Sequence, residues 1–439
     1  MGIFFGTDGI RGVVNDYLTF DLAYKCGNAV ASSINKPTII VGGDTRITRS
    51  FLSIAFSGGA MSAGANIIDV GICPTAGIAY ITKTFGADYG AVISASHNPA
   101  KYNGIKIFDR QGFKLGDKSE EMLERRFVHE VNKDCNSLGT YTQNFKLIQL
   151  YENHLVNSCK CKLNDLIIVI DASNGASYKI ASNVFKRLGA NVIETYCNDD
   201  GDNINNNCGS MYPQVLAENV KKYNADMGFA FDGDADRIIA CDENGNILDG
   251  DRILYILANY LKDKGKLNKN TIVATRHTNM GIENALNNNG IKLIRTDIGD
   301  KYVSAKIEED NLSLGGEKSG HIILRELSTT GDGILTGIKI AEIVKKSGKN
   351  LSDLCNVRLY HQSNIDCVVK DKVRVINSEV LQEEIIKQEK ILGQNSRIMV
   401  RVSGTEPKIR IMCECQDEDK CNISAKEIEK VVKEINALD

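Results

Sequence analysis

The sequence has neither a long apolar run nor an excess of basic charge. No stretch of its 439 residues approaches the ~18 consecutive apolar residues of a membrane span. The first residues lack the basic segment and small-residue cleavage site of a signal peptide. A net charge of -3 leaves no general positive field for nucleic acid or an anionic membrane. We therefore expect a cytoplasmic protein, with no nucleic-acid or membrane partner, whose affinity for phosphate is local.

The 13 cysteines form no motif typical of a disulfide framework. Their number is odd, and several lie inside apolar runs, as Cys241 does, which indicates reduced thiols in a core. The pairs Cys159/Cys161 and Cys413/Cys415 have C-x-C spacing without histidine partners. Zinc at either pair is the less favoured alternative.

A pattern of apolar strand, polar loop, helix and second apolar strand occurs three times, starting near Thr38, Leu166 and Thr271. Each copy predicts a βαβ unit, since its strands are the continuous apolar runs that parallel sheets bury. One more apolar strand follows each unit and ends in a charged or nucleophilic loop. These loops begin at Ser96, Asp232 and Glu317. Because ligands bind at the carboxyl ends of strands in open α/β sheets, we expect the loops to face one shared cleft; chance similarity among βαβ units is the alternative.

We predict an α/β fold class with three related α/β domains and a smaller α+β domain, arranged around one central cleft. The α/β domains would have mixed, largely parallel sheets, and the length is too great for one ordinary core. The predicted domains are residues 1–150, 151–250, 251–365 and 366–439. In the last domain the pattern predicts strands at 365–369, 397–402 and 409–414, and helices at 379–388 and 425–435.

The loop after residue 231 is rich in carboxylates. Asp232, Asp234 and Asp236 alternate with small residues, so a curving loop can turn three oxygen ligands toward one divalent cation. Mg²⁺ suits such a site because it takes few protein carboxylates and keeps positions for water or a phosphoryl oxygen.

Three other interpretations of this loop are open. Glu243 at the twelfth position resembles a calcium-binding EF-hand, but Arg237 stands where that motif needs glycine. The loop also resembles that of haloacid-dehalogenase phosphatases, whose nucleophilic aspartate follows a buried strand. A plain solvated turn is disfavoured, since three carboxylates within five residues repel one another without a cation.

The first functional loop carries Ser96 and His97 directly after an apolar run, and Pro99 blocks a helical continuation. Ser96 is a candidate nucleophile, with a turn residue or a helix cap as the alternatives. His97 can orient phosphoryl oxygens. Lys106 can transfer a proton or stabilise developing charge, unless it is a surface lysine.

Three further loops carry candidate binding residues. Glu317, Ser319 and His321 alternate, so an extended loop would point them to one side to hold sugar hydroxyls; His321 can instead be a structural histidine. The loop at residues 3–12 contains Asp8 and Arg11, and it is either a tight turn or a phosphate contact. Between two strands of the last domain lie four candidates for a phosphate-binding nest: Arg401, Ser403, Gly404 and Thr405.

Four of these loops, in this order and spacing, resemble those of the α-D-phosphohexomutase superfamily over essentially the whole chain. They are the loops that begin at Ser96, Asp232, Glu317 and Arg401. The segments at 5–12, 203–210, 299–303 and 329–333 are most similar to the bacterial members that act on glucosamine phosphates. Lys318, Lys301 and residues 276–278 depart from that pattern and bear on substrate preference.

The resemblance implies that Ser96 is a phosphoserine, and that Mg²⁺ binds to its phosphate and to Asp232, Asp234 and Asp236. It implies that Arg11, Lys106 and Arg237 surround the reacting phosphate. It also implies that the Glu317 loop reads the sugar and that the Arg401 loop holds the phosphate that is not reacting, in a domain that closes as a lid.

The implied reaction interconverts glucosamine 6-phosphate and glucosamine 1-phosphate, with glucosamine 1,6-bisphosphate as intermediate and activator, and feeds amino-sugar nucleotide and peptidoglycan-precursor synthesis. A sibling enzyme acting on phosphoglucose or phosphomannose is the main alternative. A catalytically silent sugar-phosphate sensor is disfavoured because Ser96 and all three aspartates are present. The chain would act as a monomer or homodimer.

Overall fold

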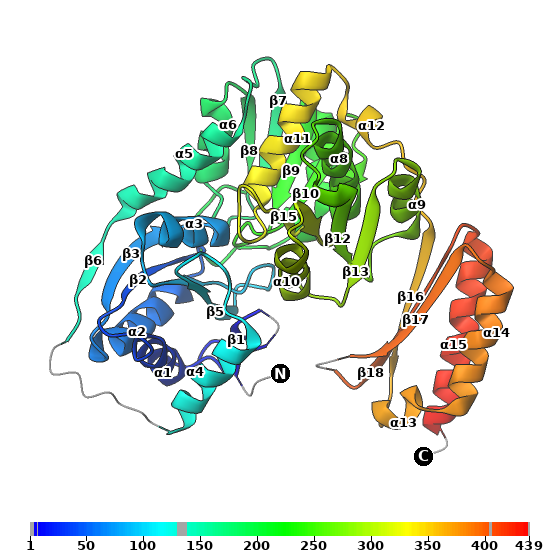
Figure 1. Cartoon of the computed structure of the whole chain (residues 1–439), viewed down its shortest axis with the longest axis horizontal. Helices are drawn as coiled ribbons and strands as arrows, with labels where there is room; N and C mark the ends of the chain where they lie inside the picture. The colour runs from blue at the N-terminus through cyan, green and yellow to red at the C-terminus, as the bar shows by residue number, and fades with distance from the viewer. Residues whose placement is uncertain (1–3, 7, 130–137, 404–405, 438–439) are drawn as a thin grey trace. The chain divides into compact units, whose positions relative to one another are not determined.

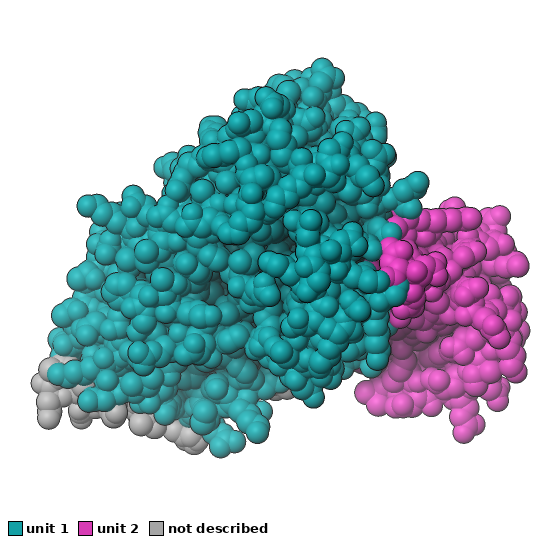
Figure 2. Space-filling view, turned by 45° about the horizontal axis from the view of Figure 1, so that its top comes forward, with its two compact units in different colours: residues 1–277, 290–356 teal, residues 278–289, 357–439 magenta. Residues whose placement is uncertain are grey.

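The computed structural model describes residues 4–6, 8–129, 138–403 and 406–437 (Figure 1). The chain forms two compact units, coloured separately in Figure 2. The larger unit comprises residues 1–277 and 290–356, and the smaller comprises residues 278–289 and 357–439. Across the described part of the chain, no helix has the length and apolar character needed to cross a membrane.

The larger unit begins with a six-stranded sheet of order β1-β5-β4-β2-β3-β6. Strands β2, β3, β4 and β6 run parallel, whereas β5 is antiparallel to both of its neighbours. The strands are β1 (Ile10–Val13), β2 (Thr38–Gly43), β3 (Asn66–Ile72), β4 (Tyr89–Ile93), β5 (Tyr102–Asp109) and β6 (Tyr141–Gln143). The helices are α1 (Phe20–Ala31), α2 (Thr48–Ser62), α3 (Thr75–Phe85), α4 (Asp117–His129), the short η1 (Phe145–Leu147) and α5 (Ile148–Ser158).

The second sheet has the order β11-β10-β9-β7-β8. Its strands are β7 (Ile167–Asp171), β8 (Asn191–Thr195), β9 (Met227–Phe231), β10 (Ile238–Asp242) and β11 (Ile247–Leu248). The accompanying helices are α6 (Ile180–Arg187), η2 (Gly209–Met211), α7 (Pro213–Tyr223) and α8 (Gly250–Asp263).

The third sheet has the order β13-β12-β14-β15. Its strands are β12 (Thr271–Thr275), β13 (Lys292–Thr296), β14 (Leu314–Gly316) and β15 (Ile322–Leu324). The helices are η3 (Asn268–Asn270), α9 (Met280–Asn288), α10 (Asp300–Asp310), α11 (Gly333–Ser347) and α12 (Leu351–Leu354). Helix α9 belongs to the smaller unit, where Asn279 and Met280 at its start bond to Tyr360 and Glu414.

The three sheets repeat one arrangement. In each, a first strand pairs in parallel with the strand after its helix: β2 with β3, β7 with β8, and β12 with β13. The first strand also pairs in parallel with a later strand, which is β4, β9 or β14, and an antiparallel strand follows. The predicted threefold repeat of largely parallel α/β sheets is therefore confirmed, and chance similarity is excluded.

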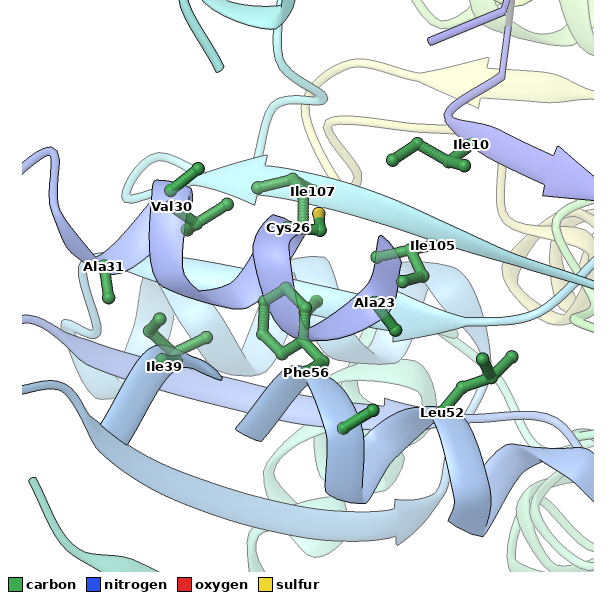
Figure 3. Close-up of a cluster of buried hydrophobic side chains, with 14 of the residues drawn as sticks. Ile10, Ala23, Cys26, Val30, Ala31, Ile39, Leu52, Phe56, Ile105 and Ile107 are labelled. Carbon is green, nitrogen blue, oxygen red and sulfur yellow. The ribbon is translucent and has the colours of Figure 1, made fainter. Parts of the chain in front are cut away.

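A hydrophobic core lies between helices α1 and α2 and the first sheet (Figure 3). Helix α1 buries Ala23, Cys26 and Val30, while Phe56 of α2 is fully buried. The helices approach closely because two glycines face the partner backbone. A Cβ on Gly27 would lie 1.9 Å from the carbonyl oxygen of Phe56, and one on Gly59 would lie 1.9 Å from that of Tyr24.

Two adjacent glycines of α2 should respond oppositely to alanine. Gly59→Ala forces the two helices apart, and we expect a loss of about 1–3 kcal/mol in the free energy of unfolding. Gly58 has only a side-chain atom of Tyr24 at 4.0 Å, so Gly58→Ala should gain about 0.5–1 kcal/mol from helix propensity. Urea unfolding of both variants measures the difference, and equal effects would contradict the packing argument.

The smaller unit has a three-stranded antiparallel sheet of order β16-β18-β17. Its elements are β16 (His361–Val368), α13 (Lys372–Ile376), α14 (Glu379–Leu392), β17 (Ser396–Val402), β18 (Lys408–Cys415) and α15 (Glu418–Ala437). The predicted α+β character is confirmed, although α13 was not predicted. Its N-cap, Asp371, accepts hydrogen bonds from the backbone of Val373 and Arg374.

Candidate active site

The acidic loop follows β9 and buries all three of its aspartates. Asp232, Asp234 and Asp236 are at most 4% exposed, and one oxygen from each lies within 4.8 Å of the others. Burial and repulsion from Asp236 and Asp234 raise the pKa of Asp232 well above its usual range. Such a carboxylate lacks sufficient positive charge around it, which is the condition that a bound cation relieves.

The triad fits Mg²⁺. Oxygens bound to one Mg²⁺ are about 3 Å apart when adjacent and about 4 Å apart when opposite, so small movements complete the site. Oδ2 of Asp234 accepts hydrogen bonds from Thr75 and Lys106, whereas its buried Oδ1 has no hydrogen-bond partner among the described residues. An oxygen in that state is available to a metal ion.

The structure places Ser96 beside this triad. Its hydroxyl donates to Oδ2 of Asp232 at 2.5 Å, and its Oγ lies 3.2 Å from Nδ1 of His97. Ser96 is fully buried and has a left-handed backbone with φ of +53°, which is uncommon outside glycine. The sequence brought Ser96 and the aspartates together through the expectation of a shared cleft and through the family resemblance.

Arg46 holds the serine loop, and sequence reasoning missed it. Its guanidinium is buried and donates to four carbonyl oxygens, namely those of Ser96 (3.0 Å), Asn98 (2.7 Å), Pro99 (2.6 Å) and Tyr102 (2.9 Å). Its Nε pairs with Asp44 at 3.0 Å. Both residues follow β2, which ends at the same sheet edge as β4. Knowing that β2 lies next to β4 in the sheet would have placed Asp44 and Arg46 beside the Ser96 loop.

Lys106 lies on β5 and joins the first sheet to the acidic loop. Its ammonium is 2.8 Å from Asp234, 3.0 Å from Asp236 and 3.2 Å from Asp8. Burial opposes the charge, but these carboxylates raise the pKa of Lys106 well above its usual range. Lys106 is therefore buried rather than a surface lysine, and it is held as a cation.

Two arginines supply further positive charge. Arg11 pairs with Asp8, and Nη1 of Arg237 lies 3.1 Å from Nδ1 of His97. The buried Nε atoms of Arg11 and Arg237 have no hydrogen-bond acceptor among the residues described. Burial, followed by the charge of Arg237, lowers the pKa of His97 to about 4. His97 is thus neutral at pH 7 and can accept the hydrogen bond from Arg237.

A second ion-pair chain crosses from the first sheet to the third. Lys114, which follows β5, lies 2.5 Å from Asp8 and 2.8 Å from Asp300 at the start of α10. Burial alone would raise the pKa of Asp8, but Lys106, Lys114 and Arg11 outweigh it and hold that pKa well below its usual range. The sequence did not single out Lys114. Asp300 belongs to the 299–303 segment that carries the family resemblance, but the sequence predicted no role for it.

The loop between β14 and β15 is a tight turn and not an extended segment. The backbone N–H of Glu317 donates to the carbonyl of His321 at 3.0 Å, and Gly320 has φ of +92°. Glu317 is half-buried, Ser319 is exposed and His321 is buried. Nε2 of His321 accepts from the Gly331 N–H at 3.0 Å, and Nδ1 lies 3.8 Å from Asp236. The turn therefore separates side chains that an extended loop would point to one side.

Oε1 of Glu317 accepts a hydrogen bond from the N–H of Gly299 at 3.2 Å. This contact links the turn to the start of α10. Burial raises the pKa of Glu317, so the carboxyl gains stabilisation from any donor that a ligand supplies.

The phosphate-binding candidates lie in the smaller unit. Arg401 is on β17 and pairs across the sheet with Arg410 of β18. Burial and the charge of Arg410 lower the pKa of Arg401, which an anion would reverse. Ser403 is buried, and its Oγ accepts from the N–H of Glu406 at 3.3 Å. Gly404 and Thr405 lie outside the described residues.

The structure also bears on the less favoured alternatives. Glu243 bonds to Ser352 and takes no part in the acidic triad, and a strand precedes that loop where an EF-hand has a helix. Every described cysteine is a free thiol. Within the described part of the chain, the Asp232 triad is the one group of three or more candidate ligands arranged for a metal, and it includes neither C-x-C pair.

The carboxylates, the serine and the fixed cations meet beside the α/β sheets, and comparison with known proteins identifies the class of protein. The four domain models of the phosphoglucomutase/phosphomannomutase family match this chain: α/β/α domain I at residues 2–134, domain II at 149–245, domain III at 249–360, and the C-terminal domain at 364–431. The chain belongs to the phosphoglucomutase/phosphomannomutase family.

Curated relatives narrow the comparison. Phosphoglucosamine mutase from Clostridium novyi (strain NT) is 42% identical to this chain, and that from Caldanaerobacter subterraneus subsp. tengcongensis is 43% identical. Each alignment covers 99% of this chain and 99% of the relative. A phosphoglucomutase/phosphomannomutase family protein from Burkholderia thailandensis shares the fold, with a TM-score of 0.83 and 24% identity over 98% of this chain and 97% of the other.

Structures of N-acetylphosphoglucosamine mutase from Aspergillus fumigatus also share the fold. One is in complex with GlcNAc-6P and magnesium, with a TM-score of 0.67, and another is with glucose 1,6-bisphosphate, with a TM-score of 0.64. Both are 16% identical and cover 99% of this chain and 96% of the other.

Proposed function

We propose that this protein interconverts glucosamine 6-phosphate and glucosamine 1-phosphate through a phosphorylated Ser96. The carrying observation is the 2.5 Å contact between the Ser96 hydroxyl and Asp232 of a buried three-carboxylate loop. The relatives named phosphoglucosamine mutase, 40–43% identical over nearly the whole chain, support the sugar.

Ser96 carries the phosphoryl group in this proposal. The bond from phosphorus to the Ser96 oxygen breaks as a bond to the oxygen of a free sugar hydroxyl forms, and the proton of that hydroxyl passes to the Ser96 oxygen, which gives glucosamine 1,6-bisphosphate and a free serine. The bisphosphate turns around and returns its other phosphoryl group to Ser96. Arg46 and Asn205 hold the Ser96 carbonyl at 3.0 and 2.8 Å, which fixes the loop during both transfers.

Phosphoryl transfer requires alignment and neutralisation of negative charge. Arg11, Lys106 and Arg237 surround the reacting phosphate, and the open Nε donors of both arginines can bond its oxygens. Because its pKa is raised, Lys106 keeps its proton and acts here as a fixed cation. Neutral His97 accepts from Arg237 and thereby orients it.

Asp232, Asp234 and Asp236 would hold Mg²⁺ together with the Ser96 phosphate. When bound, the ion neutralises charge on the phosphoryl oxygens. Without it, a phosphoserine of about -1.5 to -2 charge would adjoin three carboxylates.

Glu317, Ser319 and His321 would position the sugar, with Glu317 accepting from hydroxyls and His321 supporting the turn from inside. Arg401, Ser403, Gly404 and Thr405 would hold the phosphate that is not reacting. The C-terminal domain that carries these residues would close as a lid, because an accessible phosphoserine would lose its phosphate to water. Reduced thiols and a sugar-phosphate substrate favour a cytoplasmic location.

A mutase for phosphoglucose or phosphomannose is the alternative, because Lys318 and Lys301 depart from the glucosamine pattern and leave the substrate preference to be tested. The test compares glucosamine, glucose and mannose 6-phosphates under Mg²⁺ with a trace of the matching 1,6-bisphosphate. We expect kcat/KM at least ~10-fold higher for glucosamine, and loss of turnover in excess EDTA that Mg²⁺ restores. Faster turnover of glucose or mannose phosphate would replace this assignment with the alternative.

A further inference from the structure

A pocket lies in the larger unit, and none of its lining residues belongs to the acidic loop. Its volume is about 540 Å³, within the range of small-molecule sites. Helices α5, α8 and α11 supply most of its lining. Ser313 and Leu324 also line it. Ser313 directly precedes β14, and Leu324 pairs with Leu314 at the start of that strand, so these two lining residues lie at the end of β14 and β15 away from the Glu317 turn.

The interior of the pocket is apolar on one side. Helix α8 contributes Leu257, Leu261 and the ring of Tyr260 to the lining, and Leu324 and Leu327 add further aliphatic surface. An aromatic or aliphatic body would be stabilised here by burying its apolar surface.

The charged side chains that line the pocket have a net positive charge. Five lysines and two glutamates line it, although the chain as a whole has a net charge of -3. Lys339 and Lys346 share the buried carboxylate of Glu342, which leaves this trio with one excess positive charge. The other three lysines are exposed: Lys160, Lys264 and Lys266.

We propose that this pocket binds a small organic anion, a molecule that pairs an apolar or aromatic body with a phosphate, sulfonate or carboxylate group. The body lies against Leu257, Leu261 and Tyr260, and the anionic group faces Lys264 and Lys266. The site is separate from the reaction, so it stands whether or not the proposed substrate is correct.

The test uses 1-anilinonaphthalene-8-sulfonate, an aromatic sulfonate that fluoresces in apolar surroundings, titrated into the full-length protein. We expect saturable binding of one dye. Lys264→Glu with Lys266→Glu should weaken it at least tenfold. Lys221→Glu with Lys222→Glu is the matched control on α7, where two exposed lysines lie outside the pocket, and should leave it within twofold.

A second variant tests the pocket by volume. Asn157 is exposed on α5 and lines the pocket, so Asn157→Trp should fill it and abolish dye binding without changing a charge. The proposal is overturned if binding does not saturate, if either pocket variant binds the dye as wild type does, or if glucosamine 6-phosphate displaces it, which would place the dye at the acidic loop.

Discussion

Replacing Ser96 with alanine is expected to lower kcat for the glucosamine phosphate conversion by on the order of 10⁴-fold or more. Ser96 is the proposed carrier of the phosphoryl group, and its replacement removes the oxygen that receives that group. A coupled assay for glucosamine 1-phosphate measures the loss. Mass spectrometry should also show that the variant lacks the 80-Da phosphoryl group that a phosphoserine adds to the chain.

Ser173→Ala provides a matched control. Ser173 is also a buried serine with a left-handed backbone, φ +51°, after a strand of the second sheet, but its hydroxyl donates to the Ala172 carbonyl. We expect its kcat to stay within severalfold of wild type. Turnover that survives in Ser96→Ala would refute the phosphoserine mechanism and leave the fold assignment intact.

Replacing Arg46 with methionine is expected to lower the free energy of unfolding by about 3–5 kcal/mol. Methionine keeps much of the apolar stem but removes the guanidinium. Asp44 then lacks its cation in a fully buried position, and carbonyl oxygens of the serine loop lose their donor. Burial already raises the pKa of Asp44, and the charge of Arg46 opposes that rise.

Chemical denaturation measures this loss, with Arg110→Ala as the control. Arg110 is exposed after β5, so its removal should change stability by no more than about 0.5 kcal/mol. Since Arg46 holds the Ser96 carbonyl, kcat should fall in Arg46→Met even where the variant is fully folded. Unchanged kcat in folded protein would show that the loop keeps its shape without this clamp.

The sequence predicted the repeated sheets because each strand is a continuous apolar run followed by a polar loop. It also predicted the acidic triad, since alternating aspartates after a buried strand have few other uses. The boundaries near residues 150, 250 and 365 stay a prediction. Contacts group the first three sheets in one unit and assign α9 to the other, and no local pattern in the α9 sequence indicates that.

Other parts of the site depend on contacts that are distant in sequence. Lys114 and Asp300 are 186 residues apart, and Lys106 meets Asp234 over 128 residues. Lys114 and Asp300 each have, in the sequence alone, the pattern of an ordinary surface charge. The conformation of the Glu317 turn was also out of reach, because alternation predicts one-sided side chains only if the backbone is extended.

The ion pairs that join the sheets have a consequence for cooperativity. Lys106 belongs to the first repeat, and its partners Asp234 and Asp236 belong to the second. Lys114 connects the first repeat to the third. When one repeat opens locally, a buried charge in another repeat therefore loses its ion-pair partner. Both repeats share the free-energy cost of that loss. Hydrogen exchange in the three repeats should converge on a common opening event, and loss of activity on heating should report the integrity of the whole larger unit.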